Sequence, residues 1–95
     1  MRFSWVTVKS GDGKQFTSRI LNISENHAVL LSEHVLPAGM ACTVQENIPA
    51  HKERKPNNAD LQAEVCEVIF SPAGIHLHLK IKSLNDEAKR LINSK

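Results

Sequence analysis

Apolar and polar residues alternate along most of this chain, and helical spacing is confined to its end. Alternation is the pattern of strands that bury one face, because successive side chains of a strand point to opposite sides of a sheet. Turn-forming residues separate the alternating stretches at short intervals, which is typical of antiparallel sheets. The pattern predicts strands over Phe3–Lys9, Gln15–Ile23, His27–Ser32, Ala41–Gln45, Leu61–Phe70 and Ile75–Lys82.

The apolar phase of the predicted strand 61–70 shifts by one position in its middle. Its apolar residues are Leu61, Ala63 and Val65, followed by Val68 and Phe70. An extra residue in one strand of a pair produces such a shift, so we expect a bulge near Cys66. The next predicted strand alternates without interruption, and its polar face carries His76, His78, Lys80 and Lys82.

Helical spacing follows the last predicted strand. Its apolar residues, at i, i+4, i+7 and i+8, are Leu84, Ala88, Leu91 and Ile92. Ser83 or Asn85 can cap this helix, since both side chains accept hydrogen bonds from free backbone N–H groups. Closure is the most economical way to protect the strand edges. We therefore expect an all-β fold, a six-stranded antiparallel β-barrel with one C-terminal α-helix, as a single domain over residues 1–95.

One segment interrupts the alternating pattern. Residues Glu46–Asp60 contain two prolines, two adjacent asparagines and no apolar periodicity, which predicts an exposed and mobile loop. Within it, the basic run His51–Lys55 has two interpretations, a solvated loop or a docking site for an acidic partner or a phosphate.

Composition narrows the function classes. The chain is 41% hydrophobic and 23% charged, which favours a folded domain, and its net charge of +2 is too small to steer it to nucleic acids. Aromatic residues make up only 4%, so platforms for base stacking are scarce. No stretch approaches the roughly 18 apolar residues of a membrane span, and no signal-peptide core follows the N-terminus. We expect a cytoplasmic protein without membrane insertion.

Candidate chemistry is sparse. Cys42 and Cys66 lie far apart in apolar segments, so we expect buried free thiols. His76 and His78 share a strand face but are too few for a zinc site, which needs three or four ligands, so no metal site is expected. Recognisable nucleophile motifs, phosphate loops and paired carboxylates are missing from the sequence. The expectation is a protein that is not an enzyme and holds no cofactor.

The turn after the second predicted strand reads Asn22-Ile23-Ser24-Glu25-Asn26-His27, and the segments LPAGM, LQAEVCEVIF and GIHLHLKI follow downstream. In the order of these parts, over nearly the whole chain, the sequence resembles a PilZ domain. Members of that family are six-stranded antiparallel barrels with a C-terminal helix. They carry Asp/Asn-x-Ser-x-x-Gly after the second strand, a Leu-x-x-Gly turn, a long fifth strand and a sixth strand that begins with Gly.

The resemblance implies a site for the bacterial second messenger cyclic di-GMP. The family holds its phosphates and guanines with an Arg-x-x-x-Arg segment before the first strand, and a guanine edge with the turn motif. The matching or nearest residues here are Arg2, Arg19, Asn22, Ser24 and His27. Val6 stands where the second arginine would follow Arg2, and His27 replaces the motif's Gly. Cyclic di-GMP is therefore expected to bind weakly or not at all, with Asn22 and Ser24 acting as turn formers.

The resemblance further implies a regulatory or adaptor module of cyclic di-GMP signalling that acts by contact with another protein. The alternative is a small β-barrel that binds nucleic acid through Lys80, Lys82 and the basic loop, which the net charge and the few aromatic residues make the weaker hypothesis.

Overall fold

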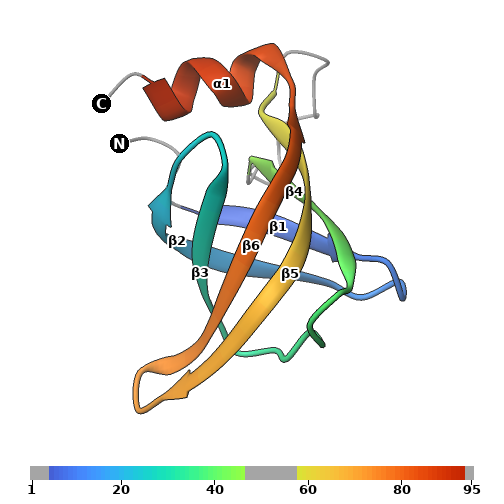
Figure 1. Cartoon of the computed structure of the whole chain (residues 1–95), viewed down its shortest axis with the longest axis vertical. Helices are drawn as coiled ribbons and strands as arrows, with labels where there is room; N and C mark the ends of the chain where they lie inside the picture. The colour runs from blue at the N-terminus through green and yellow to red at the C-terminus, as the bar shows by residue number, and fades with distance from the viewer. Residues whose placement is uncertain (1–4, 47–57, 94–95) are drawn as a thin grey trace, which may run out of the picture.

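The computed structural model describes residues 5–46 and 58–93. It contains six strands and one helix (Figure 1): β1 (Trp5–Ser10), β2 (Gln15–Ile23), β3 (His27–Ser32), β4 (Ala41–Glu46), β5 (Asp60–Ser71), β6 (Gly74–Leu84) and α1 (Asp86–Asn93). The predicted bounds of β2 and β3 are confirmed, and those of β4, β5 and β6 are correct to within two residues. The first two residues of the predicted strand Phe3–Lys9 and most of the predicted mobile loop lie outside the described residues.

The strands close into a barrel in the order β1-β2-β3-β6-β5-β4, and every neighbouring pair is antiparallel. The predicted fold class is confirmed. Short turns join β1 to β2 and β2 to β3, which are neighbours both in the sequence and in the sheet. The pairs β3–β6 and β1–β4 instead join strands that are distant in the sequence.

The alternation in the sequence fills the barrel interior. Val8 pairs with Phe16 on one side and with Val44 on the other, and Leu30 pairs with Leu77. All five side chains are buried, as expected for a barrel too narrow to hold anything but its own side chains. Among the described residues, the buried core is aliphatic apart from Phe16 and Cys42.

The ladders of the described strands shift register at three points, one of which lies between Gln62 and Ala63 of β5. The register of β5 against β6 also shifts between Val65 and Glu67, which confirms the bulge predicted near Cys66. The third shift, between Ile20 and Asn22 of β2, leaves Leu21 45% exposed. The extra residue at a bulge turns its side chain outward. The prediction that Cys66 is buried is therefore wrong, because Cys66 is exposed. Cys42 is buried, as predicted.

The C-terminal helix lies across one end of the barrel (Figure 1). Asn85 caps it, since its Oδ1 accepts a hydrogen bond from Ala88 N at 2.9 Å. The helix buries Ala88, Leu91 and Ile92 against the barrel. Leu84, predicted as part of the helical stripe, instead ends β6, where it pairs with Leu61. Of the helices in residues 5–46 and 58–93, none has the length and apolarity to cross a bilayer.

Candidate functional site

The turn between β2 and β3 is held by the hydroxyl of Ser24. Its Oγ accepts hydrogen bonds from the backbone N–H of Asn26 at 3.3 Å and of His27 at 3.2 Å, and donates to the His27 carbonyl at 3.3 Å. The backbone N–H of Ser24 donates to the same carbonyl at 2.8 Å. The Ser24 side chain therefore does the work of a turn former, and its hydrogen-bonding capacity is used inside the turn.

The backbone at His27 does not require glycine. Among the described residues, only glycines have a positive φ, so His27 has an ordinary strand conformation, although the resemblance noted in the sequence implies a Gly at this position. Asn26, one residue earlier, accepts a hydrogen bond from Ile81 N at 3.0 Å, which ties the turn to β6.

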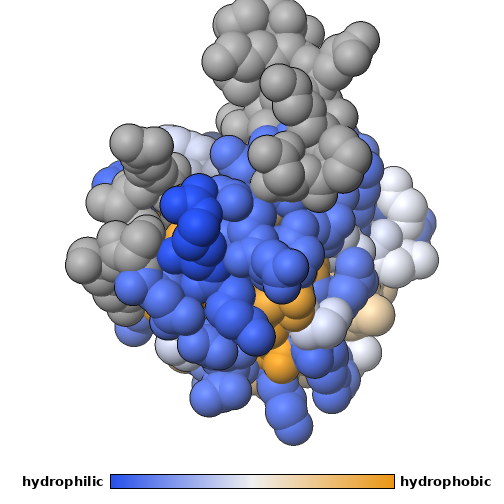
Figure 2. Space-filling view, turned by 90° about the horizontal axis from the view of Figure 1, so that it is seen from above, coloured by the Kyte–Doolittle hydropathy of each residue, from blue (hydrophilic) through white to orange (hydrophobic). Residues whose placement is uncertain are grey.

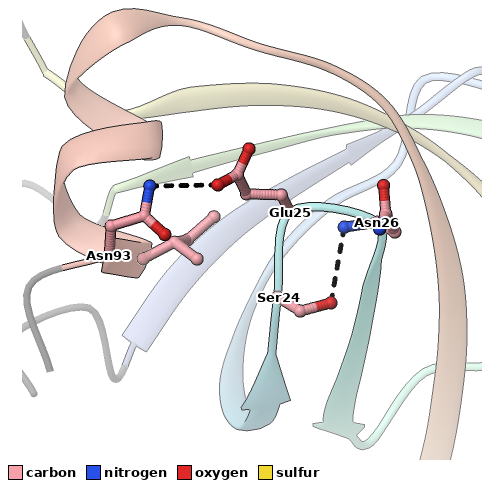
Figure 3. Close-up of a pocket in the computed structure, with 5 residues that line it drawn as sticks. Ser24, Glu25, Asn26 and Asn93 are labelled. Carbon is pink, nitrogen blue, oxygen red and sulfur yellow. Dashed lines mark hydrogen bonds between the residues drawn. The ribbon is translucent and has the colours of Figure 1, made fainter.

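The tip of the turn also reaches the C-terminal helix (Figure 3). The carboxylate of Glu25 accepts a hydrogen bond from Asn93 Nδ2 at 3.0 Å. A pocket of about 560 Å³ lies between the turn and the helix, lined by Ser24, Glu25, Asn26, Ile92 and Asn93. The charged group among these residues is a carboxylate, which repels phosphate. The pocket is therefore suited to hydrogen-bond donors or to a cation rather than to a dianionic nucleotide.

The outward side of β2, β3 and β6, which we call the outer face, brings further polar residues together. Asn22 pairs with Val29, and Val29 pairs in turn with His78. The imidazole rings of His27 and His78 lie against each other, with centroids 5.6 Å apart. His27 is exposed and His78 half-buried, so this pair and Asn22 surround Val29 on the barrel surface.

Arg19 is on the same outer face but not at the turn. It pairs with Leu31 and Trp5, two outward positions along β3 from His27. At a rise of about 3.3 Å per residue, this places the Arg19 backbone roughly 13 Å from the turn. The structure thus brings Asn22, Ser24 and His27 to one end of the barrel and leaves Arg19 apart, while Arg2 lies outside the described residues.

Sequence reasoning missed three members of this neighbourhood. Alternation placed His78 on a polar face, but only the β3–β6 register shows that it meets His27. The Glu25–Asn93 hydrogen bond joins residues from opposite parts of the chain, and no local pattern signals it.

A view onto the end of the barrel that carries α1 shows a largely hydrophilic surface with a small apolar patch (Figure 2).

Basic residues are less available than their number suggests. Lys82 forms an ion pair with Glu64 at 3.3 Å, and Arg90 is hydrogen-bonded to Glu87. The basic run at residues 51–55 lies outside the described residues. Within the part of the chain that the structure describes, no group of three or more His, Cys, Asp or Glu side chains could hold a metal ion.

Comparison with known proteins gives no relative: no protein-family model, no curated protein and no solved structure matches the chain. The resemblance to PilZ domains was drawn from the sequence alone and stays a prediction.

Proposed function

We propose that this chain is a PilZ-like regulatory or adaptor module that acts by contact with another protein, and that its cyclic di-GMP site is weak or lost. The observation that carries this proposal is that the serine hydroxyl of the β2–β3 turn bonds to the turn itself and is not free to bind a nucleotide. The Ser24 hydroxyl bonds the turn's own backbone, and Glu25 places a carboxylate in the adjoining pocket. To bind here, a nucleotide with two phosphates would have to break the hydrogen bonds of the Ser24 hydroxyl and bring its phosphates close to the Glu25 carboxylate. Both steps cost free energy.

The outer face supports the protein-contact half of the proposal. It combines cationic and imidazole groups with apolar side chains that are not fully buried. Besides Asn22 and His27, its members are Arg19, Leu21, Val29, Leu31, His76, His78 and Lys80. Such mixed surfaces suit a partner with acidic and apolar groups.

Titration calorimetry tests the nucleotide half. Cyclic di-GMP added to the wild-type chain should give no saturable heat in the low-micromolar range. Ser24→Ala should lower the free energy of unfolding, because it removes the hydroxyl that holds the turn. Saturable binding by the wild type that disappears in a folded Ser24→Ala variant would overturn the proposal.

A matched pair of charge reversals tests the contact half. Arg19→Glu alters the outer face, whereas Lys9→Glu makes the same exchange at an exposed position of β1. In affinity capture from the source cells, a protein partner should be retained by the wild type and by Lys9→Glu but not by Arg19→Glu. Equal capture by all three variants would contradict the outer face as the contact. Capture that nuclease abolishes would favour the nucleic-acid alternative.

A further inference from the structure

The second half of β5 has an open edge. Pairing with β4 extends only to Glu64, opposite Ala41, and the last bonds on that side join Val65 N to Met40 O at 2.9 Å and Gly39 N to Val65 O at 2.6 Å. Between residues 67 and 71, β5 pairs with β6 on one side, and none of the described residues pairs with it on the other side. Figure 1 shows this part of the β5–β6 hairpin extending beyond the end of the barrel.

The hydrogen-bond parity identifies which groups face that edge. Ile81 of β6 donates its N–H to Asn26 on the β3 side. Successive residues of an antiparallel strand bond alternately to one neighbour and the other, so odd-numbered residues of β6 bond β3 and even-numbered ones bond β5. Val68 and Phe70 pair with odd-numbered residues of β6. Their own N–H and C=O groups therefore point away from β6, toward the open edge.

The side chains along this edge are apolar and exposed. Phe70 is 70% exposed and Ile69 is 41% exposed. The segment Glu67–Ser71 reads EVIFS, with one charge, no proline and mostly residues that favour strands. An open edge of this composition is a template for pairing with another strand.

We propose that this edge pairs antiparallel with the same segment of a second copy of the chain, about a two-fold axis at Ile69. In that register, Val68 of each copy lies opposite Phe70 of the other. Both residues direct their backbone groups to the edge, so each such pair exchanges two hydrogen bonds. Ile69 meets Ile69, and Glu67 faces Ser71 rather than a second carboxylate.

The neighbouring symmetric register is less favourable. An axis at Phe70 would set Val68 opposite Pro72, which has no N–H to donate. The Ile69 register gives a closed two-fold pair and leaves no free edge for further addition at this segment. This dimer does not rest on the proposed adaptor function, since it pairs the backbone edge of β5 at residues 67–71, whereas the outer face is made of residues of β2, β3 and β6.

Sedimentation velocity over a concentration series tests the dimer, with charge variants at the axis. The wild type should show a reversible monomer–dimer equilibrium. Ile69→Lys and Ile69→Glu each place like charges directly opposite one another, so each should raise the dimer Kd about tenfold or more. An equimolar mixture of the two variants should restore the dimer as a heterodimer, since opposite charges then meet. Leu21→Lys, an exposed apolar position of β2, should dimerise like the wild type.

A second variant keeps the test independent of charge. Phe70→Pro removes an N–H that points to the open edge and leaves the bonds to β6 intact, so the protein should remain folded by circular dichroism and become monomeric. A wild type that stays monomeric throughout the series would overturn the proposal. So would dimerisation of Ile69→Lys or of folded Phe70→Pro with wild-type affinity, or failure of the charge-reversed mixture to associate.

Discussion

Leu91 fastens the C-terminal helix to the barrel, and Leu91→Ala should lower the free energy of unfolding by about 2 to 3 kcal/mol. The side chain is 8% exposed and sits in the buried stripe of α1 with Ala88 and Ile92. The substitution removes the isopropyl group beyond Cβ, that is three carbons at about 0.8 kcal/mol for each buried carbon group, or about 2.4 kcal/mol in total. The helix lies at the end of the barrel, where neighbours can relax into the space, so the additional cavity cost should be small.

Urea denaturation followed by circular dichroism measures this loss, with the linear extrapolation applied to both proteins. Lys89→Ala is the matched control, because Lys89 is exposed on the same helix and both residues favour helices. Its free energy of unfolding should stay within about 0.5 kcal/mol of the wild type. A Leu91→Ala effect as small as that of the control would refute the reasoning, since the helix would then contribute nothing to the stability of the barrel.

Three further predictions concern single groups. Ser18→Ala should raise the free energy of unfolding by about 1 kcal/mol in the same urea assay, because Ser18 Oγ is buried without a hydrogen-bond partner among the described residues; a loss of stability would show that the hydroxyl is satisfied. Asn85→Ala should cost about 1 to 2 kcal/mol, since Asn85 Oδ1 caps α1 and also accepts a hydrogen bond from Asp60 N at 3.1 Å; an unchanged urea midpoint would contradict this role. Iodoacetamide at pH 8 should modify Cys66 and spare Cys42 in the folded protein, because burial raises the pKa of the Cys42 thiol to about 11, and peptide mapping that finds equal labelling would contradict the burial.

The strands were predictable because their signal is local. Alternation over β2 and β3 and the phase shift at Cys66 follow directly from which face each residue turns to the core. The closed barrel followed from a general argument about strand edges, and the structure bears it out at β1–β4 and β3–β6. The same argument did not predict that β5 extends beyond its pairing with β4 and leaves an edge unpaired, since that depends on where the partner strand ends.

The candidate site was less predictable because it depends on contacts between distant segments. Asn22, Ser24 and His27 are close in sequence, so their meeting at one turn required no knowledge of the fold. The contact of His27 with His78 depends on the β3–β6 register, and that of Glu25 with Asn93 on where the helix docks. Cys66 was predicted to be buried from its apolar neighbours, but a bulged residue does not follow the faces of its strand.

The strand order sets a constraint on how the protein folds during synthesis. β3 pairs with β2 on one side and with β6 on the other, so the second edge of residues 27–32 stays unpaired until residues 75–80 have left the ribosome. The β5–β6 hairpin is joined by a short turn and can form quickly once both strands have emerged, whereas β3–β6 pairing must close a long loop. Until then, a nascent chain holding β1 to β4 carries apolar strands without a complete barrel. We expect aggregation, and any need for a chaperone, to be greatest in this interval.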